Sequence, residues 1–183
     1  VDLDARIDVD GYGAVSYDLA FGGAFYALVD APGIGLALDD AQGLISAGRA
    51  IKAAISASQD IRHPEFSDLG FLYGVIFTGP PRDSGNHSRN VCVFADGEVD
   101  RSPTGTGVSA RLAALLARDE LGVGEDIVVE SIVGSTFRGR IVEVREGDPP
   151  MIVPEVGGTA HITGRSEFWF DPDDTLGGGF LVR

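Results

Sequence analysis

The chain has 183 residues, and it contains little cysteine, little methionine and few basic side chains. Its single cysteine, Cys92, excludes an intrachain disulfide framework and a zinc site built from several cysteines. Cysteine use of this kind is typical of a reducing compartment, so a cytoplasmic location is expected. No apolar run approaches the ~20 residues that a membrane span needs, and residues 1–4 do not look like the start of a signal peptide.

Basic residues are outnumbered two to one, with 14 lysines and arginines against 28 acidic residues and a net charge of −14. Such a surface repels phosphate backbones and anionic lipid. No nucleic-acid partner and no membrane partner are therefore expected.

Glycine, in contrast to cysteine, methionine and the basic residues, is abundant in this chain. There are 26 glycines and only nine prolines, whereas glycine makes up ~7% of an average protein. Excess glycine without proline indicates many tight turns, or backbone that must approach a ligand closely. Hydrophobic residues make up 44% of the chain, enough for a sizeable core.

The hydrophobic pattern changes period along the chain. Helical spacing predicts helices over 39–59 and 103–121, with Asp39 or Asp40 capping the first and Ser102 capping the second, which has Pro103 in its first turn. Strand patterns are expected at 3–9, 14–20, 24–29, 71–77, 89–94, 126–133, 136–145, 151–156 and 160–170. This order predicts one α+β domain with mostly antiparallel pairing and no dividing linker.

The densest group of candidate functional residues is the run 100–107, Asp-Arg-Ser-Pro-Thr-Gly-Thr-Gly, at a strand end and a helix start. The free N–H groups of Gly105, Thr106 and Gly107 suit an anion, because helix N-termini combine unpaired donors with a favourable dipole. Asp100 suits an ammonium group. Together they fit a zwitterion such as an amino acid, although an ordinary capped helix stays open as the alternative. The P-loop lysine and the Rossmann glycine spacing are absent.

Several motifs, in order, resemble the proline racemase family of proline racemases, hydroxyproline epimerases and trans-3-hydroxy-L-proline dehydratases. Residues 100–107, followed by Ser-Ala-Arg at 109–111, are similar to the family signature. Residues 21–31 resemble its Gly-Gly-x-Phe-Tyr-Ala segment, and 87–91 resemble the run that leads to the signature. Residues 158–164 and Phe180-Leu181 resemble its closing stretch.

Two departures from the family pattern are informative. Thr104 stands where the family usually has cysteine, which is the mark of its 3-hydroxyproline dehydratases. The Met-Cys-Gly-His-like motif, which carries the first catalytic residue of such enzymes, has no counterpart here. The resemblance therefore implies the second half of a longer enzyme, with 1–158 as its second lobe and 159–183 returning to the first. The implied fold is one lobe of the diaminopimelate-epimerase type, an antiparallel sheet wrapped around a central helix.

The activity that the resemblance implies is cofactor-independent dehydration of trans-3-hydroxy-L-proline. Thr104 is the expected catalytic residue, Asp100, Gly105 and Thr106 are expected to bind the substrate, and the first lobe is expected to supply a thiol base. The alternatives are a proline racemase or hydroxyproline epimerase variant and a non-catalytic amino-acid-binding remnant. The expected partners are a small imino acid, the first lobe and a second copy in a homodimer, with no cofactor and no metal.

The chemistry of threonine agrees with this assignment. A thiol of pKa ~8.5 can be tuned into a thiolate base, whereas a threonine hydroxyl cannot ionise near neutral pH. Racemisation needs an acid and a base on opposite faces of the α-carbon, so Thr104 disables one partner. Dehydration needs only one base and a route for the departing hydroxide.

The remaining candidates, which lie outside the run 100–107, give weaker indications of function. Cys92 lies among apolar residues and is expected to be an inert core thiol. His87 and His161 fall in family-like segments, and each either lines the site or has a structural role. Asp18 alternates with apolar residues and is expected on a solvated face, as are Asp8 and Asp10.

Overall fold

The computed structural model describes residues 1–147 and 150–180. In this part of the chain nine strands form one sheet, with two α-helices and two short 3₁₀ helices. The strands are β1 (Asp2–Val9), β2 (Gly13–Phe21), β3 (Phe25–Asp30), β4 (Leu72–Gly79), β5 (Ser88–Phe94), β6 (Glu98–Val99), β7 (Asp126–Glu130), β8 (Thr136–Arg145) and β9 (Met151–Gly157). The helices are α1 (Ala41–Ser58) and α2 (Gly105–Ala117), and the 3₁₀ helices are Pro32–Ile34 and Ser67–Leu69.

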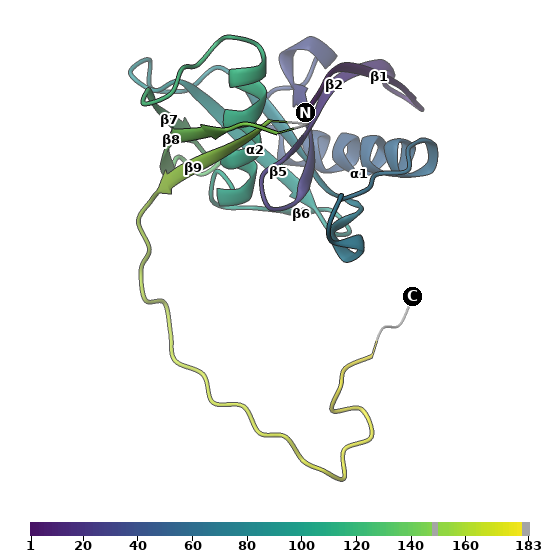
Figure 1. Cartoon of the computed structure of the whole chain (residues 1–183). Coiled ribbons are helices and arrows are strands. Elements are labelled where there is room, and N and C mark those ends of the chain that lie inside the picture. The colour runs from purple at the N-terminus through teal and green to yellow at the C-terminus, as the bar shows by residue number, and fades with distance from the viewer. Residues whose placement is uncertain (148–149, 181–183) are drawn as a thin grey trace.

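The sheet curves around α2. Its strand order is β1-β2-β3-β4-β5-β7-β8-β9, with β6 paired to β5. Helix α2 packs against β2 and β3 on one side and against β8 and β9 on the other, so distant parts of the sheet meet the same helix (Figure 1). The expected lobe, a sheet wrapped around a central helix, is confirmed.

The strand pairing is more mixed than the sequence predicts. β3 pairs with β4 in parallel, and β5 pairs with β7 in parallel, while the other pairs are antiparallel. Each parallel pair is joined through a helix, α1 in the first case and α2 in the second. A helical crossover returns the chain to the same end of the sheet, so the next strand must run in the same direction.

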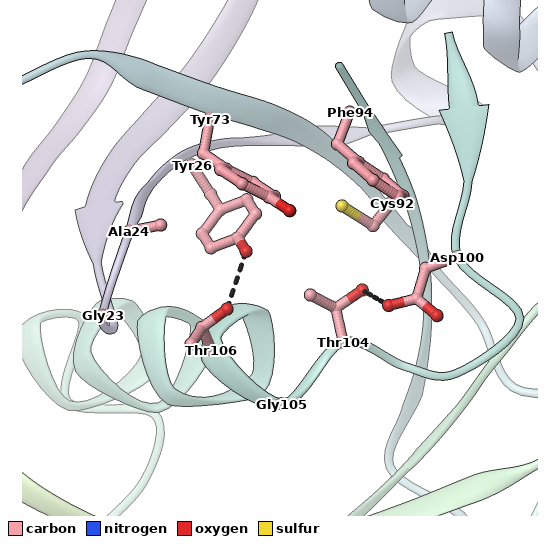
Figure 2. A pocket seen from close by; sticks show the side chains of 10 residues that line it. All are labelled: Gly23, Ala24, Tyr26, Tyr73, Cys92, Phe94, Asp100, Thr104, Gly105 and Thr106. Atoms are coloured by element: carbon pink, nitrogen blue, oxygen red, sulfur yellow. Dashed lines mark hydrogen bonds between the residues drawn. The ribbon is translucent and has the colours of Figure 1, made fainter. Parts of the chain in front are cut away.

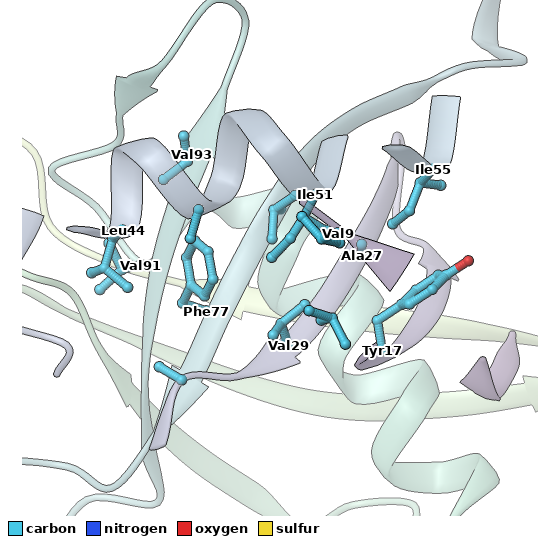
Figure 3. Packing of buried hydrophobic residues seen from close by; sticks show 14 of the residues in the cluster. Val9, Tyr17, Ala27, Val29, Leu44, Ile51, Ile55, Phe77, Val91 and Val93 are labelled. Atoms are coloured by element: carbon cyan, nitrogen blue, oxygen red, sulfur yellow. The ribbon is translucent and has the colours of Figure 1, made fainter. Parts of the chain in front are cut away.

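Helix α1 covers the opposite face of the sheet from α2 and buries the largest apolar cluster (Figure 3). Asp40 caps it by accepting a 2.9 Å hydrogen bond from the Gly43 N–H, as the sequence predicts. Asp39 does not cap the helix but pairs with Arg82 and Arg89. The cluster includes Val9, Tyr17, Ala27, Val29, Leu44, Ile51, Ile55, Phe77, Val91 and Val93.

Asp18 corrects the expectation of a solvated face. Its side chain is only 15% exposed and accepts hydrogen bonds from the Arg118 guanidinium at 2.6 and 3.1 Å. Asp4 binds the same guanidinium at 2.7 Å. These contacts tie β1 and β2 to the end of α2, and they hold the pKa of Arg118 above its ordinary value. The sequence separation of 100 residues between Asp18 and Arg118 hid this pair.

The predicted strand at 160–170 is wrong. Residues 158–180 contain no helix or strand, they are exposed, and they run away from the body of the lobe (Figure 1). Their backbone lacks a neighbouring strand to pair with, and a lone strand leaves its hydrogen-bonding groups unmatched. Ile162, Phe168, Trp169 and Phe170 are each more than 80% exposed. Leu181, part of the family-like closing stretch, lies outside the described residues.

None of the helices in the described residues combines the length and the apolar character needed to cross a membrane.

Candidate active site

The functional candidates meet at the N-terminus of α2. The helix begins at Gly105, and Thr104 is the residue that caps it, rather than Ser102. The Ser102 hydroxyl instead accepts a 3.0 Å hydrogen bond from the Thr104 N–H. Pro103 lies before the cap and not in the first turn, because the chain is not yet helical there.

Asp100 holds the turn that precedes the helix. One carboxylate oxygen accepts the Thr104 hydroxyl at 2.8 Å, and the other accepts the Ser102 N–H at 2.8 Å (Figure 2). The Thr104 hydroxyl therefore gives its proton to Asp100 instead of accepting from the helix backbone. Its oxygen keeps lone pairs for a ligand, and the half-buried carboxylate keeps room for an ammonium donor.

Thr104 adopts a backbone conformation that costs energy. Its φ is 69°, in the left-handed region that β-branched residues rarely enter. Strain of this kind costs roughly 1–3 kcal/mol and persists only where neighbouring groups enforce it. The fully buried Asn90 donates to the Pro103 carbonyl at 3.4 Å, and Ser135 donates to the Arg101 carbonyl at 3.0 Å. Both contacts fix the turn that presents Thr104.

The first N–H groups of α2 are open to a ligand. Thr104 makes no side-chain capping bond, and within the described residues no acceptor is recorded for the N–H groups of Gly105 and Thr106. Both residues are exposed and line a cavity of about 510 Å³. Unpaired donors at a helix N-terminus are a site for a carboxylate.

Aromatic rings form the wall opposite these donors (Figure 2). Tyr73 and Phe94 stack with their centroids 5.7 Å apart and an interplanar angle of 8°, and Tyr26 meets Tyr73 edge-on at 5.6 Å. The floor is completed by Gly23, Ala24 and Cys92. The cavity therefore combines polar groups at one end with an apolar wall that suits a small ring.

Tyr26 links this wall to the helix. Its hydroxyl lies 2.7 Å from the Thr106 hydroxyl, and its ring is 1% exposed. Burial raises the pKa of Tyr26 to about 12, an effect that the hydrogen bond to Thr106 only partly opposes. The phenol is therefore neutral at physiological pH and orients Thr106 beside the free N–H groups.

Cys92 lies in the cavity, which the sequence did not indicate. The expectation of a buried thiol holds, since its exposure is 1%, but its side chain lines the cavity near Thr104 (Figure 2). Burial raises the pKa of Cys92 to about 12, and a contact with Thr104 offsets this only partly. The alternation of β5 was the available signal, because Asn90 and Cys92 share the face that looks toward α2.

This protonation state predicts slow alkylation of Cys92. A rise from the ordinary value of 9.0 to about 12 lowers the thiolate fraction near pH 8 by about 10³. Iodoacetamide should therefore label the folded protein at least ~10²-fold more slowly than the urea-unfolded protein. Mass spectrometry of quenched time points measures both rates, and equal rates would contradict a neutral buried thiol.

Gly22 allows the β2–β3 turn to lie directly against α2. A Cβ at this position would collide with the Thr106 carbonyl oxygen and the Ala110 backbone nitrogen. Only a residue without a side chain permits this approach, which sets the distance between the aromatic wall and the helix N-terminus.

Gly22→Ala should therefore destabilise the fold by ~1–3 kcal/mol, since overpacking against backbone cannot be relieved by a rotamer change. Gly157→Ala is the matched control, because no atom lies within 4 Å of its added Cβ. It should stay within ~0.5 kcal/mol of the parent chain. Urea unfolding followed by fluorescence measures both, and a similar loss in the two variants would refute the packing argument.

The two candidate histidines, His87 and His161, lie away from the cavity. The His87 N–H donates to the Val128 carbonyl at 2.9 Å, and its Nδ1 lies 2.9 Å from the Ser88 hydroxyl. His161 is exposed in the segment that leaves the lobe. Neither lines the cavity that holds Thr104 and Asp100. The structure thus joins four of the six candidate residues, Asp100, Thr104, Gly105 and Thr106.

Comparison with known proteins identifies the family of this chain. The family model described as proline racemase matches residues 1–181. The chain belongs to the proline racemase family. A trans-3-hydroxy-L-proline dehydratase of Colwellia psychrerythraea is 45% identical over 98% of the chain and 52% of its own length. A 3-hydroxyproline 2-epimerase of Burkholderia multivorans is 43% identical over 98% of the chain and 55% of its own length.

Solved structures of this family have the same fold. A probable proline racemase from Agrobacterium radiobacter with bound carbonate has a TM-score of 0.89 and 35% identity, covering 99% of the chain and 54% of that protein. A hydroxyproline epimerase from Agrobacterium vitis with bound trans-4-hydroxy-L-proline has a TM-score of 0.88 and 33% identity, covering 99% and 52%. The chain spans about half the length of the relatives that it matches.

Proposed function

We propose that the intact protein dehydrates trans-3-hydroxy-L-proline without a cofactor, and that this chain supplies the substrate-binding half. The observation that carries the proposal is the threonine at position 104. It lies at the mouth of the α2 helix with its hydroxyl on Asp100, where a racemase needs an ionisable acid–base group. The dehydratase from Colwellia psychrerythraea, at 45% identity, supports the same reaction class.

The cavity groups suit a cyclic imino acid. The substrate carboxylate would accept from the N–H groups of Gly105 and Thr106, and its ring nitrogen would donate to Asp100. The stacked rings of Tyr73 and Phe94 would cover the apolar edge of the pyrrolidine ring. A carboxylate held by helix donors withdraws electron density from the α-carbon, and this eases loss of the α-proton.

The reaction then needs a base and a leaving group. A thiolate of the first lobe would take the α-proton, the C–O bond at the β-carbon would break, and a double bond would form between the two carbons. The proton and the hydroxide together make water, so the step balances without an oxidant. The Thr104 hydroxyl would exchange its hydrogen bond to Asp100 for one to the departing oxygen, or it would orient a water molecule.

An epimerase variant is the second candidate. The 3-hydroxyproline 2-epimerase of Burkholderia multivorans is 43% identical to the chain, close to the identity of the dehydratases. An epimerase must return a proton to the α-carbon from the second face. Thr104 offers no ionisable group for that step, so the dehydratase is preferred.

The decisive assay separates the two reactions. Full-length protein is incubated in deuterated water with trans-3-hydroxy-L-proline, with 4-hydroxyproline and with proline, and α-exchange, inversion and water loss are followed by NMR. Dehydration of the 3-hydroxy substrate with negligible inversion of the other two is the expected result. Efficient inversion of proline with Thr104 in place would refute the dehydratase and favour the epimerase.

Four further expectations belong to this proposal. The exposed segment 159–180 would return to the first lobe and bury its aromatic side chains there. The first lobe would close over the cavity and bring the thiol opposite Thr104. A homodimer and a cytoplasmic location stay predictions of the sequence.

A further inference from the structure

A second cavity, of about 410 Å³, lies along α2 beyond the candidate active site. Strands β1, β2, β3 and β4 form one side, and the C-terminal half of α2 with the turn after it forms the other. It shares no lining residue with the cavity at the helix N-terminus. Its lining includes two arginines and four carboxylates: Arg111, Arg118, Asp4, Asp18, Asp30 and Glu120.

Arg111 is the arginine of this cavity whose side chain lacks a hydrogen-bond partner among the described residues. Its Nε is fully buried and has no hydrogen-bond partner, and within the described residues no hydrogen bond or ion pair is recorded for its guanidinium. Arg118, about two helical turns further on, instead binds Asp4 and Asp18. The guanidinium of Arg118 therefore has hydrogen-bond acceptors within the fold, whereas that of Arg111 has none in the described residues.

The Nε–H of Arg111 is a buried donor without an acceptor, and such a donor destabilises the fold. The guanidinium stays protonated instead of shedding its charge. Burial lowers the pKa of Arg111 below its ordinary value, and the charges of Glu120, Asp18 and Asp30 oppose this shift only partly. An oxygen ligand in the cavity would provide the missing acceptor.

Two carboxylates of the same cavity also keep free acceptor capacity. Asp30 binds the Gly33 N–H through Oδ2 at 2.9 Å, and no partner is recorded for its Oδ1. Glu120 makes no side-chain hydrogen bond that the described residues record, and its charge acts on Arg111. Leu28, Ala114 and Leu115 supply apolar surface between these groups.

We propose that this cavity binds a small zwitterionic amino or imino acid, with its carboxylate on Arg111 and its ammonium group on Asp30 and Glu120. A plain anion would meet the two carboxylates, and a plain cation would meet Arg111. A molecule that carries both charges matches both, and the planar guanidinium suits a carboxylate fork. A cavity of about 410 Å³ has the size of a small-ligand site.

The second site takes no part in the proposed reaction. A ligand there would contact Arg111, Ala114 and Leu115 of α2, whereas the active-site donors lie in the first turn of the same helix. Amide signals of Thr78 and Ala114 report on this cavity, whereas those of Gly105 and Thr106 report on the first. An absence of ligand binding at one cavity is therefore distinguishable from an absence of binding at the other.

The test is an NMR titration of the 183-residue chain with L-proline, with propionate as an anion-only probe and with pyrrolidine as a cation-only probe. L-Proline should shift the Thr78 and Ala114 amides saturably, and the two single-charge probes should bind at least about tenfold more weakly. Arg111→Met should abolish these shifts. Arg145→Met, which removes an exposed arginine of β8, is the matched control and should leave them unchanged.

If Arg111→Met fails to fold, Asp30→Asn provides a second test. This substitution removes only the group that would bind the ammonium group of the ligand. It should weaken L-proline binding at Thr78 and Ala114 at least about tenfold while leaving propionate binding unaffected or improved. Saturable shifts confined to Gly105 and Thr106 would overturn the second site. Equal affinity for propionate and L-proline would show an anion site only and would also overturn it.

Discussion

Replacing Thr104 by cysteine in the full-length enzyme should raise inversion at the α-carbon of proline or 4-hydroxyproline by ~10²–10⁴, the usual contribution of one acid–base group. A thiol at this position lies at the N-terminus of α2, where the helix dipole favours the thiolate. The change also removes a β-branched side chain from a residue whose φ is 69°. Inversion in deuterated water, followed by chiral chromatography, measures the gain.

The control for this gain is Thr104→Ser, which keeps the hydroxyl and its bond to Asp100. It should dehydrate trans-3-hydroxy-L-proline and should not invert proline. Thr104→Cys should still remove the α-proton of trans-3-hydroxy-L-proline, because the proposed mechanism assigns the base to the other lobe. A Thr104→Cys variant without any gain in inversion would show that position 104 does not face the α-carbon.

The second large effect is a complete loss: residues 1–183 alone should not turn over trans-3-hydroxy-L-proline. The only thiol of this chain is Cys92, and burial raises its pKa to about 12, so no thiolate is available near neutral pH. The chain should still bind L-proline at Gly105 and Thr106. Spectrophotometric assay of the purified chain, beside the full-length enzyme at equal concentration, measures the difference.

The Cys92→Ala variant shows whether any residual turnover by the 183-residue chain depends on Cys92. Activity of the 183-residue chain that disappears in Cys92→Ala would make this cysteine the base, and it would overturn the assignment of the base to the first lobe. Residual activity that is equal in both forms would point to a contaminating enzyme. The substitution leaves Thr104 and Asp100 in place, so it does not dismantle the substrate site.

Local patterns in the sequence determined much of the site. The run 100–107 combines a carboxylate, a turn and two glycines before an apolar helical stripe, and this predicts a helix N-terminus with open donors wherever the chain folds. In the described residues the N–H groups of Gly105 and Thr106 have no recorded acceptor, and Thr104, not Ser102, precedes the helix. The exact cap depends on backbone torsions of a strained turn, which residue types alone do not specify.

Strand and helix periods likewise come from local alternation, and nearly all of the predicted elements are present within a few residues. The exception at 160–170 shows the limit of this reasoning. Alternation predicts that a segment can form a strand, but a strand exists only where a partner strand is present. The direction of pairing between β5 and β7 also escaped prediction, because it follows from the path of a crossover.

The sequence by itself therefore determined the residue types, the helix that presents Thr104 and the substitution that disfavours racemisation. Only the tertiary structure decided which distant residues meet: Cys92 beside Thr104, Tyr26 on Thr106, and Asp18 on Arg118. It also left the Arg111 Nε buried without a hydrogen-bond partner. The physical reason is that such contacts depend on the curvature of the sheet around α2. This curvature results from side-chain packing throughout the lobe, which local sequence does not specify.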